Sequence, residues 1–392
     1  MKARKVLLGM ILPLLLFSCA KNEVVDNRGK VVESDDGLSL IVTDMQNRSN
    51  TIAKSKRNKI ICLGAGALRY YSYVGDISKI IAVEKIDSET TFGVGQALRP
   101  YYMANYDTLK ELLVVKQGGP MNQTVSPEEA EDILKANPDI IVSFLSAETN
   151  DRLQEMVEIP VIGLDQGSDG VFDKTTQKSL QMLGDIFDKK ERATELINYV
   201  NTCKDDFSSL KMTTETYYFG GIGNWGQTSM LGSMIGFPIS KYAKVNDVVE
   251  TIGLKGKNGN VVTKGQGTVD FEKLLETNPD KIFIDTAGIN GFKQHYNEPG
   301  NAKNYNGLKA FETGETYLLM PYNAYYSNLE IQLMSTYYVA SVAHSNFTIN
   351  LEDKMNEITN KFLGKDLYNE IKAHQYGMGG YQKVDLKELA NK

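Results

Sequence analysis

The sequence has 392 residues, of which 42% are hydrophobic, and its formal net charge at pH 7 is −6. A chain of this length can form two domains, each with its own hydrophobic core. The negative charge argues against nucleic-acid binding, because proteins that bind phosphate backbones need a basic surface. The 21 tyrosines, against 3 histidines and 1 tryptophan, favour a surface that binds organic molecules through apolar rings with polar tips.

The first 19 residues have the features of an export signal. Lys2, Arg4 and Lys5 precede the apolar run 6–17, which is too short for a membrane-spanning helix and is typical of a signal peptide. The run ends at Cys19 in the sequence LFSC, which resembles the bacterial lipobox, where a lipidated cysteine becomes the mature N-terminus. A plain secretory signal with an incidental cysteine is the alternative. We therefore expect an extracytoplasmic protein, lipid-anchored to a bacterial membrane on its periplasmic or cell-surface side.

The next segment, residues 20–52, is polar and nearly free of aromatic residues. Such a composition buries too little apolar surface to fold alone. We therefore expect a polar tether between the anchor and the folded part of the chain. Residues 38–42 (LSLIV) could add an edge strand to the first lobe.

Residues 53–187 predict an N-terminal lobe. A strand at 59–63 runs into the glycine turn 64–66 and then into a helix, and further apolar strands follow at 80–83, 140–142 and 161–164. Strands that alternate with helices indicate a parallel sheet covered by helices on both faces.

Residues 188–210 predict one long helix between two lobes. Asp188 and Glu191 have the spacing of a capping box, and apolar residues recur at helical spacing from Ala193 to Phe207. At 1.5 Å per residue this helix would be about 30 Å long, the width of a small domain. We expect it to join the lobes as a rigid strut.

Residues 211–392 predict a C-terminal lobe with closing helices. It opens with a strand at 217–220, again followed by glycines, and 316–319 supplies another strand. Helices are expected at 328–343, 351–362 and 367–373. The glycine-rich segment 377–381 is expected to be a loop, and the sequence assigns it no role.

One stretch occurs twice in the chain. VSPEEAEDILKANPDIIVSF at 125–144 and VDFEKLLETNPDKIFID at 269–285 align when Pro138 lies over Pro279. Each copy predicts a short helix that ends before the proline, followed by a buried strand of apolar residues. A unit that occurs twice indicates two similar lobes, and a chance match of a common helix-to-strand turn is the alternative. The predicted fold class is α/β, with two doubly wound Rossmann-like lobes, the long helix spanning between them, and a ligand cleft between the lobes.

No pattern in the chain is typical of an enzyme. G-x-G-x-x-G occurs at 221–226, but Trp225 inside this loop obstructs the close approach of a dinucleotide. There is no G-x-S-x-G elbow and no H-E-x-x-H. Three histidines are scattered without the spacing of metal ligands: His295, His344 and His374. The sequence therefore predicts no catalytic residues, no metal site and no cofactor.

Two cysteines remain after Cys19. Cys62 lies in an apolar strand and Cys203 lies on a helix. An exported protein can pair such residues in a disulfide. Their surroundings favour buried free thiols instead.

Two aromatic, proline-bearing loops are candidates for a ligand site. They span residues 98–102 (LRPYY) and 320–326 (MPYNAYY), the second directly after a predicted strand. Ligands of open parallel sheets bind beyond the carboxyl ends of the strands, so loops from two facing lobes would line one cleft suited to a bulky polar or anionic ligand. We expect ligand contacts from Trp225, Tyr101, Arg99, Tyr325, Tyr326, Asn323 and Arg69. The alternative is that the tyrosines are partly buried anchors of their loops.

From residue 57 to residue 362 the chain resembles the substrate-binding proteins of bacterial ABC importers for iron-siderophores, haem and cobalamin. The resemblance rests on the strand at 59–63, on VGDISKIIAVE at 74–84, on both E-x-x-x-x-x-x-P-D units and on GLKA at 307–310. It implies two α/β lobes that are joined by one long helix and move little on binding. The polar tether and the glycine-rich tail depart from the family average.

The resemblance also implies a docking surface. In relatives, one glutamate per lobe pairs with arginines of the permease, and by position in the repeat these are Glu131 and Glu272. Each is expected in the first turn of its helix, where the helix dipole stabilises a carboxylate. The alternative is that both are ordinary acidic residues at helix starts.

The function that these features imply is a monomeric, lipid-anchored substrate-binding protein. It would capture a metal chelate such as an iron-siderophore or haem, or a cobalamin-like corrinoid, and deliver it to an ABC importer through the permease. The alternatives are a surface enzyme that uses the same cleft and a sensor or adhesion protein that kept the fold.

Overall fold

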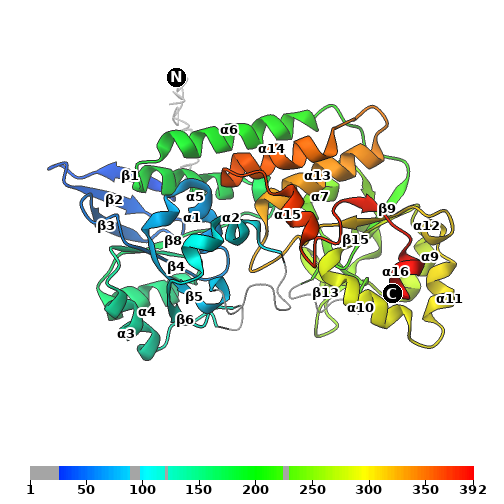
Figure 1. Ribbon diagram of the computed structural model, residues 1–392, viewed down its shortest axis with the longest axis horizontal. Coiled ribbons are helices and arrows are strands. Elements are labelled where there is room, and N and C mark those ends of the chain that lie inside the picture. Colours follow the sequence, from blue (N-terminus) through cyan, green and yellow to red (C-terminus); the bar gives the residue numbers. More distant parts are fainter. Residues whose placement is uncertain (1–25, 89–97, 120–121, 224–228) are drawn as a thin grey trace, which may run out of the picture.

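The computed structural model describes residues 26–88, 98–119, 122–223 and 229–392. Figure 1 shows two lobes side by side, with long helices running above them. Each lobe contains a five-stranded sheet. The signal peptide, Cys19 and Trp225 lie outside the described residues.

The N-terminal lobe is built on a sheet in which all neighbouring strands are parallel. Its strands are β4 (Ile60–Leu63), β5 (Ile80–Glu84), β6 (Leu113–Lys116), β7 (Ile140–Ser143) and β8 (Val161–Gly163), in the order β6-β5-β4-β7-β8. Its helices are α1 (Ala67–Val74), α2 (Pro100–Leu109), α3 (Pro127–Ala136), α4 (Ala147–Val157) and α5 (Lys174–Ile186). Among its described residues, short 3-10 turns occur at Ile77–Lys79, Lys85–Asp87 and Gly170–Phe172. Every residue of β4 and β7 is buried, as in sheets covered on both faces.

The C-terminal lobe has a similar sheet with one antiparallel edge. Its strands are β9 (Thr216–Gly220), β11 (Asn246–Asp247), β15 (Lys281–Asp285), β16 (Thr316–Leu319) and β17 (Gln382–Lys383), in the order β11-β9-β15-β16-β17. Only β17 runs antiparallel to its neighbour in this sheet. The glycine-rich tail therefore leads into the edge strand that closes this sheet.

Further elements surround the second sheet. An antiparallel sheet is formed by β10 (Gly232–Ile235), β12 (Leu254–Lys255), β13 (Val261–Val262) and β14 (Gly265–Thr268). The helices are α7 (Pro238–Tyr242), α8 (Val249–Ile252), α9 (Phe271–Thr277), α10 (Ile289–Tyr296), α11 (Asn301–Asn306), α12 (Lys309–Glu312), α15 (Tyr368–Ala373) and α16 (Leu386–Ala390), with a 3-10 turn at Thr286–Gly288.

The repeated stretch forms the same unit in both lobes. α3 and α9 each end at an asparagine in the left-handed conformation, with φ of 53° at Asn137 and 49° at Asn278. The aspartate after each proline then anchors the neighbouring strand, β4 in one lobe and β9 in the other. The Asp139 carboxylate accepts from two backbone N–H groups ahead of β4, and the Asp280 carboxylate accepts from the backbone N–H at the start of β9. The predicted fold class, two doubly wound α/β lobes, is confirmed.

The helix between the lobes is α6 (Lys190–Asp206). Figure 1 shows it along the top of the molecule, beside α13 (Leu329–Ala343) and α14 (Leu351–Leu363). It is shorter than the predicted 188–210, and the predicted capping box does not form. Asp188 has a φ of 56°, and its carboxylate pairs with Arg57 at 2.6 Å. The helix therefore begins at Lys190 without a side-chain cap.

Residues 30–53 form a three-stranded antiparallel sheet instead of the predicted tether. We call it the meander; its strands are β1 (Lys30–Glu33), β2 (Ser39–Thr43) and β3 (Ser49–Ala53), in that order. β2 is its central strand and adds no edge to the lobe sheet. The buried side chains of Leu40, Val42 and Ile52 join the core of the N-terminal lobe. The polar composition predicted a tether because such a segment cannot form a hydrophobic core alone. That prediction was wrong because this segment packs on the core of the N-terminal lobe instead.

The meander covers the outer edge of β8. Arg48 Nη1 donates to the Val161 carbonyl at 2.6 Å, and the Asp44 carboxylate accepts from the Gly163 N–H at 2.9 Å. The N–H of Met45 donates to the Gly163 carbonyl at 3.0 Å. An uncovered edge is a template for pairing with other chains, and these contacts close it.

One cluster of buried apolar side chains runs through both lobes. It includes Leu183 of α5, Val200 of α6, Phe219 of β9 and Tyr337 of α13. Two smaller clusters lie on the other faces of the two large sheets. Because the lobes share a core, moving one against the other would expose apolar surface to water.

The state of the cysteines and the absence of a membrane-spanning helix can both be read from the described residues. Cys62 and Cys203 are both buried and unpaired, as predicted. In the part of the chain that the structure describes, no helix is both long enough and apolar enough to cross a membrane.

The contact between the meander and β8 yields a stability prediction. The Arg48 side chain is 9% exposed and lies 3.1 Å from the fully buried Asp44 carboxylate. Arg48→Ala leaves this carboxylate buried without its cation, so we expect the free energy of unfolding to fall by about 3 kcal/mol. Urea denaturation measures this. Lys54→Ala is the control, because its partner Glu33 is 67% exposed, and it should cost less than about 1 kcal/mol. Equal effects of the two substitutions would contradict the assignment.

Candidate functional site

The two lobes meet at residues 320–328, which lead from β16 to α13. On the C-terminal side, the Asp285 carboxylate at the end of β15 accepts from the Tyr322 N–H at 2.8 Å. On the N-terminal side, Asn328 Nδ2 donates to the Leu98 carbonyl at 3.0 Å. The segment therefore joins the carboxyl ends of the C-terminal sheet to the other lobe.

Arg69 of α1 holds this segment from the N-terminal lobe. Its side chain is completely buried. Nη1 donates to the carbonyls of Tyr325 and Ser327 at 3.0 and 3.1 Å, and Nη2 donates to the carbonyl of Ala324 at 2.5 Å. The guanidinium also lies 4.7 Å from the ring centroid of Tyr101, at cation–π distance. A planar fork of donors suits such a set of carbonyls better than an ammonium group would.

Tyr325 and Tyr326 both adopt the left-handed conformation, with φ of 53° and 75°. Such residues cost about 1–3 kcal/mol each and persist only where the surroundings enforce them. Here the carbonyl contacts of Arg69 enforce the turn. The result is that the two rings diverge. Tyr325 is 8% exposed and donates to the Glu84 carboxylate at 2.5 Å, whereas Tyr326 is 42% exposed.

The Tyr326 ring covers the carboxyl ends of two strands of the N-terminal sheet. Its centroid lies 5.4 Å from that of Phe144, directly after β7. Its Cβ lies against Gly66 in the turn after β4, where an added Cβ would be 3.2 Å away. Gly66 also has a φ of 92°, so this position needs glycine for both conformation and space. An exposed ring from one lobe therefore lies on the strand ends of the other.

Buried charged groups lie behind these tyrosines. Asp87 is central, with Arg99 Nη1 at 2.7 Å and the Tyr101 hydroxyl at 2.6 Å. Burial raises the pKa of Asp87, against the opposing effect of the Arg99 charge. Burial also raises the pKa of Glu330 on α13, whose carboxylate accepts from the Tyr73 hydroxyl.

Glu84, the last residue of β5, is the carboxyl that accepts from Tyr325. It is 1% exposed, and its other oxygen lies 3.7 Å from Lys116 Nζ. Burial raises its pKa from 4.5 to about 7, although the Tyr325 hydroxyl and the Lys116 charge oppose the shift. A contact between the lobes thus includes a carboxyl that titrates near neutral pH.

The structure brings most of the predicted ligand residues into this one region. Their exposure differs greatly: Arg69 0%, Tyr101 1%, Arg99 2%, Tyr325 8% and Tyr326 42%. Asn323 is half-buried and accepts from the Ser327 hydroxyl at 3.1 Å. Tyr326 therefore presents the largest free surface among those that the structure describes.

Residues 374–376 also reach this region, which the sequence did not indicate. Thr286 Oγ1, directly after β15, donates to the Tyr376 carbonyl at 2.6 Å. Burial, together with the Arg99 charge nearby, lowers the pKa of His374. The segment follows α15, far along the chain from both aromatic loops, and only the folded structure brings it beside them.

The two predicted docking glutamates are both exposed. Glu272 lies in the first turn of α9, as predicted. Glu131 does not lie in the first turn of α3, because this helix begins further upstream at a capping box formed by Ser126 and Glu129. The two helices match at their ends but not at their starts.

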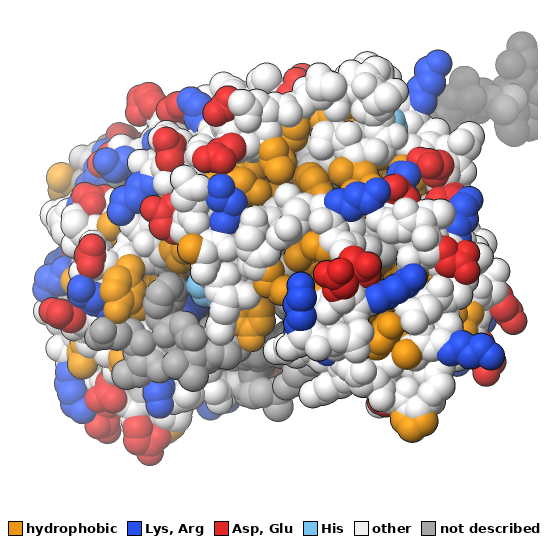
Figure 2. Space-filling model, turned by 45° about the vertical axis from the view of Figure 1, so that its right-hand side comes forward, with side chains coloured by type: hydrophobic (Ala, Val, Ile, Leu, Met, Phe, Trp, Pro, Cys, Tyr) orange, Lys and Arg blue, Asp and Glu red, His pale blue; other side chains and the backbone are white. Residues whose placement is uncertain are grey.

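The described residues show neither a surface of one charge on the face drawn in Figure 2 nor a cluster of metal ligands. Figure 2 shows basic and acidic side chains interspersed over the face drawn there, without segregation of charge. Within the described ranges, no group of three histidine, cysteine, aspartate or glutamate side chains could hold a metal ion.

The fold and the meeting of strand ends between two lobes define a binding protein of the two-lobe α/β class. The family model for periplasmic binding proteins matches residues 67–310, more than half of the sequence, and the chain belongs to this family. The family inferred from the sequence is thereby confirmed. Membership implies a location outside the cytoplasm.

Solved structures of such proteins share the fold. A periplasmic solute binding protein from Veillonella parvula matches with a TM-score of 0.62 and 18% identity, over 86% of this chain and 97% of that one. A molybdate-bound protein, MolA of Haemophilus influenzae, matches with a TM-score of 0.59 and 16% identity, over 83% and 98%. FepB from Veillonella parvula matches with a TM-score of 0.58 and 19% identity, over 83% and 97%. A search of curated protein sequences finds no match.

Glu84 yields a prediction about pH. Its pKa in the folded protein, about 7, lies above its ordinary value of 4.5, so the native state binds a proton more tightly than the unfolded state. The stabilisation is complete below about pH 4.5 and is lost as the pH rises to about 7. Between about pH 4 and pH 8 the unfolding free energy should fall by about 3 kcal/mol relative to that of Glu84→Gln, which cannot titrate. Denaturant titrations at a series of pH values measure this difference. Parallel pH profiles for the two proteins would contradict it.

Proposed function

We propose that this protein is an extracytoplasmic substrate-binding protein that captures a metal chelate or a corrinoid-like ligand and delivers it to an ABC importer. The observation that carries the proposal is the exposed Tyr326 ring, which one lobe places over the carboxyl ends of β4 and β7 in the other. Ligands of parallel α/β sheets bind at such strand ends. Two sheets whose ends meet at one loop make one site for one ligand.

The chemistry of this region supports an organic chelate. Tyrosine and tryptophan rings stack on flat organic ligands and still offer polar atoms. The enforced left-handed turn at Tyr325 and Tyr326 holds the exposed ring in one place before the ligand arrives. We propose that Tyr326 and Trp225 contact the ligand directly, with Asn323 and Tyr325 at the margin.

The buried members of the set have a different role in this proposal. Arg69, Arg99 and Tyr101 are all at most 2% exposed. We propose that they hold the ligand-binding loops in position through the contacts described above. The MolA structure contains molybdate, and a Helicobacter pylori CeuE structure, with a TM-score of 0.52, contains a nickel–histidine complex. Small metal-containing ligands are therefore compatible with this fold.

We propose that Cys19 carries the lipid anchor. Ten residues separate Cys19 from Lys30, where β1 begins. Even fully extended, they would span only about 35 Å, so the N-terminal lobe would lie close to the membrane. In cells fed a labelled fatty acid, Cys19→Ala should abolish incorporation of the label, and normal labelling of that variant would refute the anchor.

The ligand site is tested through Tyr326. Tyr326→Ala removes the exposed ring, and we expect ligand affinity to fall by at least tenfold, as for other aromatic anchors. Titration calorimetry with a ferric siderophore, haem and cobalamin measures this for whichever ligand binds. Tyr326→Phe is the matched control, because it keeps the ring and should keep most of the affinity. If Tyr326→Ala and Trp225→Ala together leave binding unchanged, the site lies elsewhere.

Docking to the permease is tested by the paired glutamates. Exposed carboxylates at equivalent places in two lobes can each form a bidentate pair with an arginine of a partner. Glu131→Ala with Glu272→Ala should leave stability and ligand affinity nearly unchanged but reduce ligand uptake by cells roughly tenfold or more. The control replaces exposed neighbours on the same two helices, Glu128→Ala with Glu276→Ala, and should transport normally. Equal uptake by both double variants would argue that Glu131 and Glu272 play no part in docking.

A further inference from the structure

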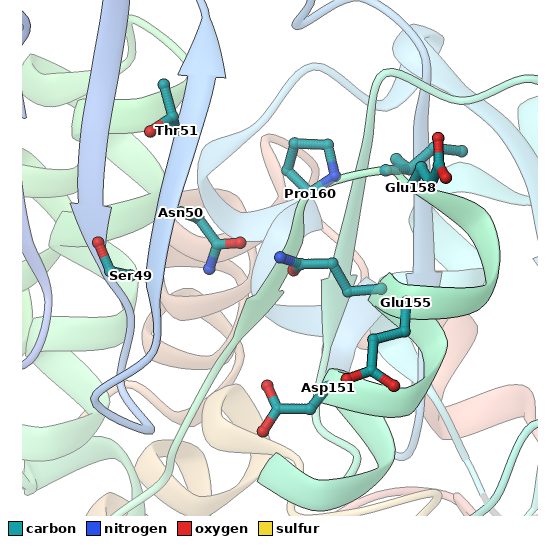
Figure 3. A pocket seen from close by; sticks show the side chains of 9 residues that line it. Ser49, Asn50, Thr51, Asp151, Glu155, Glu158 and Pro160 are labelled. Atoms are coloured by element: carbon teal, nitrogen blue, oxygen red, sulfur yellow. The ribbon is translucent and has the colours of Figure 1, made fainter.

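A pocket of about 530 Å³ lies on the N-terminal lobe, at the outer edge of its sheet. Figure 3 shows β3 on one side of the pocket and α4 on the other. The walls include Ser49, Asn50, Thr51, Asp151, Glu155 and Glu158. The residues between α4 and β8 also line it, so it lies near the amino end of β8. The candidate ligand site lies at the carboxyl ends of the strands, so the two are separate.

β3 presents a free strand edge to this pocket. In the ladder between β2 and β3, the Lys54 N–H donates to the Leu38 carbonyl at 3.0 Å. Hydrogen-bonded and non-bonded pairs alternate along an antiparallel ladder. Counting along the register from this pair, the backbone N–H and C=O groups of Ser49 and Thr51 point away from β2. In Figure 3 the pocket lies on that side of β3.

Asn50 carries an acceptor that the protein leaves unsatisfied. The residue is 3% exposed. Its Nδ2 donates to the Val161 carbonyl at 3.2 Å, whereas its Oδ1 has no hydrogen-bond partner among the described residues. In Figure 3 the Asn50 side chain points from β3 toward the pocket. A buried acceptor without a partner costs free energy, which a donor from a ligand would recover.

The opposite wall of the pocket is acidic. Asp151, Glu155 and Glu158 are all exposed on or directly after α4. Asp151 is paired with Arg48 at 2.6 Å. In the described part of the chain, neither Glu155 nor Glu158 has a cationic partner. This wall therefore keeps uncompensated negative charge.

We propose that this groove binds an extended peptide segment, rich in lysine or arginine, from a partner protein. The segment adds to β3 as a fourth strand of the meander. Its backbone pairs with Ser49 and Thr51, as in other cases of strand addition, and a donor from the segment reaches Asn50 Oδ1. Its basic side chains lie against Glu155 and Glu158. A free strand edge requires an extended backbone, and uncompensated carboxylates require positive charge, so one occupant meets both requirements.

The groove is formed by segments on both sides of the residue at which the match to the family model begins. The meander lies before residue 67, where the match to the family begins, whereas α4 lies inside the matched range. The proposal does not depend on ligand capture, because neither Tyr326 nor any other candidate ligand residue lines the groove.

The test uses the full chain and a fluorescent peptide of four Lys-Thr repeats with blocked ends. Fluorescence polarisation should show saturable binding, and a peptide of four Glu-Thr repeats should not bind. Glu155→Gln with Glu158→Gln should weaken binding roughly three- to tenfold, as expected for two exposed ion pairs. Glu276→Gln with Glu370→Gln makes the same charge change on exposed residues of the other lobe and should leave binding unchanged. Equal effects of the two double variants would overturn the proposal.

Strand addition itself is tested by the backbone of the peptide. Only every second amide of an added strand faces β3. N-methylation of all lysine amides or of all threonine amides should therefore abolish binding in one case and preserve it in the other. Bound peptide should also slow hydrogen exchange of the amides at Ser49 and Thr51. Spermidine that competes as well as the peptide, or two methylated peptides that behave alike, would overturn the proposal.

Discussion

The contact between the Arg69 guanidinium and three carbonyls of residues 324–327 is the interaction on which the rest of the site depends. A buried cation without partners costs several kcal/mol, and so does a run of buried carbonyls without donors. Each side therefore needs the other. The same contact enforces the left-handed turn at Tyr325 and Tyr326, so it decides which ring faces inward and which faces solvent. The contact that joins the lobes thus also places the exposed Tyr326 ring, which is the candidate ligand surface.

The connection between the lobes is broader than one helix. α6, α13 and α14 lie together above both lobes, and their apolar side chains belong to the same core as residues of both large sheets. Opening such a core exposes apolar surface, which opposes large hinge motion. Polar contacts such as that of Tyr325 with Glu84 also join the lobes, at the carboxyl ends of the strands. The shared apolar core therefore makes the two lobes stiff relative to each other, and the Tyr325–Glu84 contact between them includes a group that titrates.

The two lobes use the same unit and elaborate it differently. In both, a helix ends at an asparagine, and the aspartate two residues later anchors the neighbouring strand, β4 or β9. The N-terminal lobe then covers its open edge with the meander, whereas the C-terminal lobe pairs its edge with β17 from the chain's last residues. Both solutions deal with the same problem of exposed strand edges. The meander leaves its own outer strand, β3, uncovered, and that is where the second proposed site lies.

Much of the fold followed from local signals in the sequence. The helices before Pro138 and Pro279 end where the sequence predicted, and the short apolar runs after them form buried strands. These effects act over a few residues, so they can be predicted from the sequence. The repeat of the unit correctly indicated two lobes. The family also followed from the sequence pattern, whereas the order of strands within each sheet did not. The sequence did not determine whether the long side chains of the candidate site are buried, or which groups they contact. Arg69, Arg99 and Tyr101 were expected to contact a ligand, but they are buried. Arg69 donates to a carbonyl 258 residues away in the sequence. Residues 30–53 fold, and Asp188 caps no helix, because each found partners elsewhere in the structure. Burial and pairing between distant segments are properties of the assembled fold, so only the tertiary structure decided them.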